Sequence, residues 1–86
     1  MKLHILKITH SFYWEVSYGF KKAEIRKNDR DYKVGDLIHF VQVNGQEFLN
    51  EPDNVYRITH ILQNIPEYGL NEDYVILSIE HMKGGK

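Results

Sequence analysis

The amino-acid sequence predicts a small, mainly β protein of the α+β class, a barrel of five or six short strands with one or two short helices. Segments in which apolar and polar residues alternate recur along the chain, separated by Gly, Pro, Asn and Asp. Apolar residues at helical spacing stand out in one early segment. The 86 residues leave room for one hydrophobic core, so residues 1–86 are expected to form a single domain. Closure into a barrel would remove the exposed edges of so small a sheet.

The first expected strand, at residues 2–8, is followed by the expected helix at residues 11–18. In the helix, Phe12 and Val16 recur at helical spacing. Gly19 follows directly and suits a helix C-terminus, because glycine adopts a left-handed backbone at little cost. Later strands are expected at residues 23–28, 37–43, 55–62 and 74–81.

Turn signals separate the later strands. Residues 34–36 (Val-Gly-Asp) are expected to form a tight turn, with a structural role for its glycine and aspartate. Residues 44–45 (Asn-Gly) are a strong hairpin signal, from which residues 46–49 are expected to pair back. Residues 63–73 contain a proline and a glycine and are expected to be a loop. Residues 83–86 are expected to be a frayed end.

The net charge of −1 conceals an uneven distribution. Residues 1–43 hold eight Lys or Arg against five Asp or Glu, whereas residues 44–86 hold three against seven. Six of the eleven basic residues fall between Lys21 and Lys33. A role in binding nucleic acid would therefore involve a small basic patch, and extensive coating of a phosphate backbone is not favoured.

The basic patch contains the spacing Gly-x-Lys-x-x-Glu-x-Arg, formed by Gly19, Lys21, Glu24 and Arg26. In a strand over residues 23–28, Glu24 and Arg26 share one face. Charged residues on a strand face do not build a core, so they indicate a surface that handles a polar ligand. Lys21 with Glu24 can act as an acid/base pair. Arg26 can make a bidentate contact to a phosphate or carboxylate.

A structural role for the same residues is equally open. Glu24 and Arg26 can pair with each other, or with Lys7 and His4 on a neighbouring strand. Cross-strand charge pairs of this kind are common and contribute roughly 0.2 to 1 kcal/mol.

Residues 19–36, together with His4-x-Leu6-Lys7-Ile8, resemble the ASCH domains of the PUA-like superfamily. More narrowly, they are similar to a group of short, uncharacterised bacterial and phage-borne ASCH-like proteins. The resemblance covers nearly the whole chain, and the string Glu-Ile-Arg-Lys-Asn-Asp-Arg at residues 24–30 is its specific part. It implies a PUA-like β-barrel, a cleft bordered by the Gly-x-Lys-x-x-Glu-x-Arg segment, and RNA binding.

One branch of small ASCH proteins hydrolyses the amide of an acetylated cytidine with a lysine, a threonine and a later glutamate. On this resemblance Lys21 matches the lysine, but Glu24 stands where that branch has threonine. The later glutamate comes from a helical insertion that this chain lacks, which leaves Glu67 or Glu72 to take its place. Lys21 and Glu24 are thus the expected catalytic residues only if the chain is an enzyme.

The residues expected to bind the ligand are Lys7, Lys21, Glu24, Arg26, Asn28, Arg30 and Trp14. Trp14 is expected to be a half-exposed platform, because aromatic rings beside Lys and Arg suit a stacked nucleobase. Phe12, Phe40 and Tyr56 are expected in the core. Residues 28–31 can equally be a loop whose side chains bind the local backbone.

Composition excludes several classes of site. The five histidines are scattered without a close ligand pair, and there is no cysteine, so neither a metal nor a disulfide is expected. The chain has no phosphate-cradling glycine loop, dinucleotide fingerprint or Gly-x-Ser-x-Gly motif, so no cofactor is expected. It also lacks a signal-peptide pattern and an apolar stretch of 18 residues, so a cytoplasmic protein without a membrane segment is expected.

Three functions remain open. The favoured one is a module that binds RNA or a modified nucleotide without chemistry. The second is a small amidohydrolase of an acylated nucleoside that uses Lys21 and Glu24. The third is a phage or bacterial protein-interaction module, in which Glu47, Glu51 or Asp53 of the acidic second half meets a partner.

Overall fold

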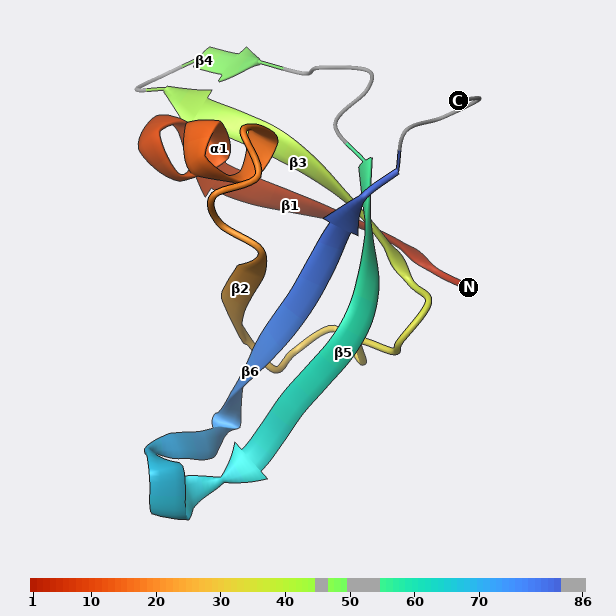
Figure 1. Cartoon of the computed structure of the whole chain (residues 1–86), viewed down its shortest axis with the longest axis vertical. Helices are drawn as coiled ribbons and strands as arrows, with labels where there is room; N and C mark the ends of the chain where they lie inside the picture. The colour runs from red at the N-terminus through yellow and green to blue at the C-terminus, as the bar shows by residue number, and fades with distance from the viewer. Residues whose placement is uncertain (45–46, 50–54, 83–86) are drawn as a thin grey trace.

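Five strands form one curled sheet in the order β1-β3-β5-β6-β2, and β4 pairs with β3 (Figure 1). The computed structural model describes residues 1–44, 47–49 and 55–82. Its elements are β1 (Leu3–Thr9), α1 (His10–Ser17), β2 (Ala23–Lys27), β3 (Leu37–Asn44), β4 (Glu47–Leu49), β5 (Val55–Ile65), the 3₁₀ turn η1 (Pro66–Tyr68) and β6 (Leu70–His81). The predicted fold class, a small and mainly β barrel-like domain, is confirmed.

The candidate site lies on a seam between the first two strands. β1 and β3 are parallel neighbours, and the other paired strands are antiparallel. β1 and β2 therefore stand at opposite ends of the five-strand path. The sheet curls so far that Arg26 of β2 reaches β1, where its Nη2 lies 2.7 Å from the carbonyl oxygen of Lys7. The two outer strands thus face each other across a gap that a side chain bridges.

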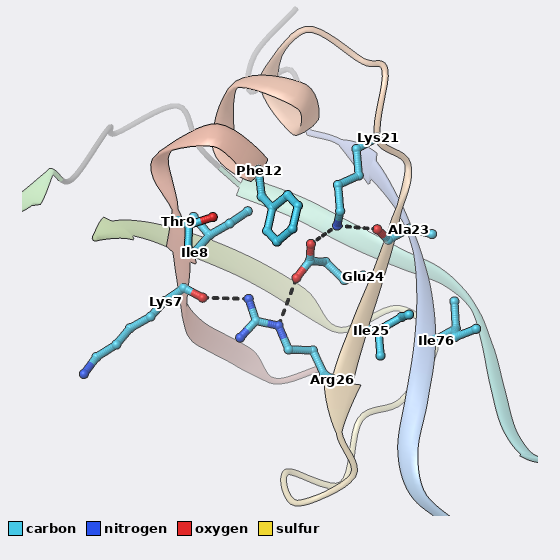
Figure 2. A pocket seen from close by; sticks show the side chains of 10 residues that line it. All are labelled: Lys7, Ile8, Thr9, Phe12, Lys21, Ala23, Glu24, Ile25, Arg26 and Ile76. Atoms are coloured by element: carbon cyan, nitrogen blue, oxygen red, sulfur yellow. Dashed lines mark hydrogen bonds and ion pairs between the residues drawn. The ribbon is translucent and has the colours of Figure 1, made fainter. Parts of the chain in front are cut away.

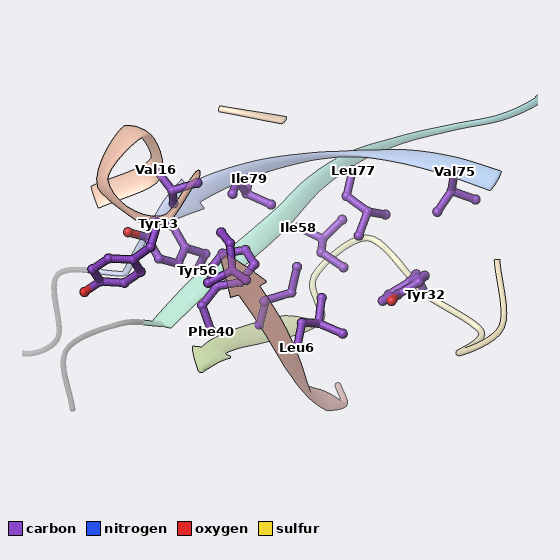
Figure 3. Packing of buried hydrophobic residues seen from close by; sticks show 12 residues of the cluster. Leu6, Tyr13, Val16, Tyr32, Phe40, Tyr56, Ile58, Val75, Leu77 and Ile79 are labelled. Atoms are coloured by element: carbon purple, nitrogen blue, oxygen red, sulfur yellow. The ribbon is translucent and has the colours of Figure 1, made fainter. Parts of the chain in front are cut away.

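The core is formed by alternating residues of the strands and by the inner face of α1 (Figure 3). α1 contributes Tyr13 and Val16, and the centre holds Phe40 and Ile58, which have no exposed surface. Burying a side chain of this size contributes roughly 1.5 to 3 kcal/mol. Burial also raises the pKa of Tyr56 to about 12, so the phenol stays neutral inside the core.

A buried polar cluster fixes the turn before β3. Asp36 is only 4% exposed, and its carboxylate accepts hydrogen bonds from the backbone N–H groups of Lys2 at 3.0 Å and Lys33 at 3.1 Å. Nε2 of His4 donates a third at 2.8 Å. Burial opposes ionisation of Asp36, but these hydrogen bonds outweigh it and lower its pKa. His4 is thus paired with Asp36, and of the pairings expected from the sequence, that of Glu24 with Arg26 is present.

The predicted loop at residues 63–73 is wrong. β5 continues to Ile65, β6 begins at Leu70, and these two residues pair across a hairpin closed by η1 and Gly69. The hairpin projects beyond the rest of the sheet (Figure 1). Most of its residues there are exposed on both faces, so no apolar alternation marks them as strands.

The strand expected at residues 55–62 is present, but the alternation of buried and exposed residues along β5 holds only as far as Ile58. A bulge between Ile58 and His60 shifts the register against β6. As a result Ile61, and not Leu62, packs against the core, and Leu62 is 41% exposed.

Several other predicted features hold. The helix ends before Gly19, whose φ is 82°, and β4 pairs back on β3 with Asn44 opposite Glu47. Glu51, Asp53 and the expected frayed end lie outside the described residues.

Candidate functional site

β2 turns a charged side chain inward at the seam. Exposure alternates along this strand, and Glu24 is 4% exposed whereas the neighbouring Ile25 is 66% exposed. This reverses the usual arrangement, in which apolar strand residues face the interior. A buried carboxylate is costly unless cations and hydrogen bonds surround it. The surroundings of Glu24 supply both.

Two cations flank the Glu24 carboxylate, one on each oxygen (Figure 2). The Lys21 ammonium donates to Oε1, and Nε of Arg26 donates to Oε2 at 2.9 Å. Lys21 also donates to the carbonyl of Ala23, and Arg26 to that of Lys7. A guanidinium carries five N–H donors and an ammonium three, so these contacts leave further donors on each cation for a ligand.

An open pocket of about 540 Å³ lies against this ion cluster. The ring of Phe12 from α1 forms one wall, with its centroid 5.6 Å from the Lys21 ammonium. The other lining residues are Lys7, Ile8, Thr9, Ala23, Glu24, Ile25, Arg26 and Ile76. A mostly apolar wall with a few placed charges, in a volume between about 300 and 1,000 Å³, is typical of a site for a small ligand.

A second hollow of about 500 Å³ extends the site along the seam. Ile5, Lys7, Arg26, Arg30 and Val41 line it, so Lys7 and Arg26 border both hollows. Nη1 of Arg30 lies 3.3 Å from the carbonyl oxygen of Ile5, which holds this side chain across to β1. The seam therefore carries a row of basic side chains beside the pocket.

The structure brings together five of the seven residues predicted to bind the ligand: Lys7, Lys21, Glu24, Arg26 and Arg30. Asn28 and Trp14 do not line either hollow. Asn28 is bonded to β6, since its backbone N–H donates to the carbonyl of Asp73 at 2.8 Å. Trp14 is 42% exposed, but its ring stacks on Tyr18, away from the seam pocket.

Sequence reasoning missed Phe12 as a site residue and placed it in the core. Phe12 is 51% exposed and forms a wall of the pocket, whereas Phe40 and Tyr56 are buried as predicted. α1 has only 8 residues and buries Tyr13 and Val16, which leaves Phe12 beside the seam. Helical spacing could not distinguish these apolar positions. The one indication in the sequence that Phe12 lies at the site was that the helix follows directly after β1, one edge of the seam.

A family model matches residues 3–79, and its description is a domain of unknown function (DUF3850). The chain belongs to this family. No curated protein matches the chain. The matched range includes every residue that lines the two hollows of the seam, so the site is part of the DUF3850 domain.

Two findings on other classes of site apply to the part of the chain that the structure describes. Within residues 1–44, 47–49 and 55–82, no helix is both long and apolar enough to cross a membrane. In the same ranges, no three His, Asp or Glu side chains are grouped so that they could hold a metal ion.

Proposed function

We propose that this DUF3850 chain is a module that binds RNA or a modified nucleotide in the seam between β1 and β2. The observation that carries the proposal is a carboxylate held between two cations at the wall of an open pocket that also has an aromatic side. A nucleotide has matching parts: an anionic phosphate, a flat ring, and a polar edge that both donates and accepts hydrogen bonds.

The phosphate fits the row of basic side chains. Lys7, Arg26 and Arg30 line the second hollow, and Nε of Arg26 is ion-paired with Glu24, which also pairs with Lys21. An arginine can contact two oxygens of one phosphate at once, which adds geometric selectivity to the charge attraction.

The base fits the pocket beside Phe12. The half-exposed ring offers a flat apolar face, and stacking of a base on an aromatic ring contributes roughly 1 to 3 kcal/mol. Lys21 donates and Glu24 accepts, so together they can pair with the polar edge of a base. Their fixed positions would favour one arrangement of donors and acceptors, and therefore one kind of base or modification.

The resemblance of residues 4–36 to ASCH domains supports the same conclusion. It implies a cleft bordered by the segment that carries Lys21, Glu24 and Arg26, and these side chains line the pocket. The PUA-like assignment and the RNA ligand are part of this proposal.

A second function, hydrolysis of an acylated nucleoside, is favoured by one observation. Lys21 and Glu24 are in direct contact inside the pocket, as an acid/base pair would be. Water would add to the acyl carbon, the C–N bond would break, and the amine would leave with a proton. Glu67 and Glu72 lie on the projecting hairpin and line neither hollow of the seam, so the later glutamate of the small ASCH amidohydrolases has no counterpart among the residues that line these hollows.

Calorimetric titration with a short single-stranded RNA and with a panel of free modified nucleosides tests the proposal. Lys21→Met and Arg30→Gln each remove one cation of the site and keep most of the side-chain volume. Each is expected to weaken binding about tenfold, the effect of one charge-assisted hydrogen bond. Lys33→Met is the matched control, because this lysine is 70% exposed and pairs with Asp31 on the surface.

Binding by the parent and by Lys33→Met, with weaker binding by both site variants, supports the proposal. Release of the free amine from an acylated nucleoside by the parent but not by Lys21→Met would make the chain an enzyme. If the parent binds none of these ligands, the proposed function is wrong.

A further inference from the structure

Three aromatic side chains form an exposed row at the C-terminal end of α1. The rings of Trp14 and Tyr18 are stacked, with centroids 5.3 Å apart and an interplanar angle of 22°. The centroids of Tyr18 and Phe20 are 6.5 Å apart. Trp14 is 42% exposed, Tyr18 67% and Phe20 84%. Rings of this size normally stabilise a small domain from inside its core, so a row left in solvent indicates a contact surface.

A further hollow, of about 790 Å³, begins beside this row. Tyr18, Lys21 and Lys22 line it from the segment after α1, and Ser78 and His81 line it from β6. Lys21 also lines the pocket against Glu24. The seam pocket and this hollow therefore share Lys21 in their linings.

We propose that the aromatic row and this hollow bind the nucleotides adjacent to the one held in the seam. The physiological ligand is then a single-stranded nucleic acid of several nucleotides and not a free nucleoside. This inference rests on the proposed function of the seam pocket and adds a class of ligand to it.

The chemistry of the surface favours a nucleic-acid strand. Every base has a flat face that can stack on an exposed aromatic ring, whatever its sequence. Lys22 lies just after the row, lines the hollow and can neutralise a phosphate that links successive bases. The acidic residue of the hollow, Glu80, is ion-paired with Arg57, which reduces its repulsion of a phosphate.

The test measures affinity by calorimetry as the ligand grows from a mononucleotide to a hexanucleotide of single-stranded RNA. Tyr18→Ala and Lys22→Gln change exposed residues of the row and hollow and leave the seam pocket intact. Tyr68→Ala is the matched control, because Tyr68 is 84% exposed on η1, far from α1 in the molecule (Figure 1). Arg30→Gln reports on the seam itself.

The inference predicts that affinity rises with length until the row is covered. Tyr18→Ala should then weaken hexanucleotide binding at least about fivefold, the lower end of one stacking contact, and leave mononucleotide binding unchanged. Tyr68→Ala should match the parent at every length.

Two results would overturn the inference in distinguishable ways. If affinity is independent of length and Tyr18→Ala is neutral while Arg30→Gln still weakens binding, the seam pocket binds a nucleotide but the aromatic row does not. If no nucleotide of any length binds, both the inference and the proposed function are wrong.

Discussion

Glu24 connects the charged side chains of the candidate site. Its side chain is buried at the seam, and its two oxygens are occupied by Lys21 and Arg26. This arrangement shows that the structural and functional interpretations of the motif are compatible. The ion pairs hold the two cations in place, and both cationic side chains line the pocket.

Removal of one partner should reveal the cost of the buried carboxylate. Arg26→Met should lower the free energy of unfolding by about 2 kcal/mol, because Glu24 loses one of its two charge-assisted hydrogen bonds in a buried position. The double variant Glu24→Met/Arg26→Met should recover part of that loss, since a buried ion pair and an apolar pair are often of similar stability. Urea unfolding of the parent and both variants measures this. A double variant less stable than Arg26→Met would contradict the explanation.

The His4–Asp36 pair predicts how the stability of the fold depends on pH. Hydrogen bonds from His4, Lys2 and Lys33 lower the pKa of Asp36 below its ordinary value of 3.8 despite its burial. The stabilisation is therefore fully present above pH 3.8 and is lost as the pH falls through the lower pKa of the folded state. Thermal unfolding of the parent and Asp36→Asn between pH 6 and pH 2 should show the two converging at low pH. A constant difference between them would mean that the ionised carboxylate is not the source of the stabilisation.

The charged residues of the site could be predicted and its aromatic wall could not. Alternation along a strand has a period of two whatever the residues are, so Glu24 and Arg26 could be placed on one face from the sequence alone. A helix of two turns offers several apolar positions at similar angles, and only the packing of α1 on the sheet decides that Phe12 stays outside. The curvature of the sheet could not be predicted either. It decides which strand lies opposite β2, and therefore that Arg26 contacts the backbone carbonyl of Lys7.

At the scale of elements, the β5–β6 hairpin shows where sequence patterns stop being informative. Its inner half was predicted because one face is buried and alternates. Its outer half is exposed on both faces, so its residues carry no such pattern, and a proline and a glycine were interpreted as a loop. The bulge after Ile58 reverses the alternation in the middle of β5, so that Ile61 packs against the core and Leu62 is exposed.

The turn that closes this hairpin depends on Gly69. Its φ of 89° lies in the left-handed region, and a Cβ added there would meet nothing within 4 Å, so only backbone strain opposes a substitution. Gly69→Ala should destabilise the fold by about 1 kcal/mol, and Gly69→Asn by less, because asparagine tolerates this conformation better. Chemical unfolding of the two variants measures the difference. Equal stability of Gly69→Ala and the parent would show that the turn relaxes into another conformation.

Across the whole molecule, the basic and the acidic residues lie in different parts of the fold. The basic first half supplies the seam residues Lys7, Lys21, Arg26 and Arg30, whereas residues 58–82, which run through most of β5, η1 and β6, hold four acidic residues and no Lys or Arg. A strand of nucleic acid would therefore be attracted to the seam and repelled from the projecting hairpin. The number of phosphates held should be small, because the basic patch is local.

The salt dependence of RNA binding tests whether the basic side chains of the seam bind phosphates. Affinity for a hexanucleotide should fall with rising salt with a logarithmic slope of about 0.7 per phosphate contacted, which for two or three phosphates is roughly 1.4 to 2. Arg30→Gln should lower that slope by about 0.7, and Lys33→Met should leave it unchanged. A slope that neither variant alters, or equal loss in both, would contradict a phosphate-binding role for the seam.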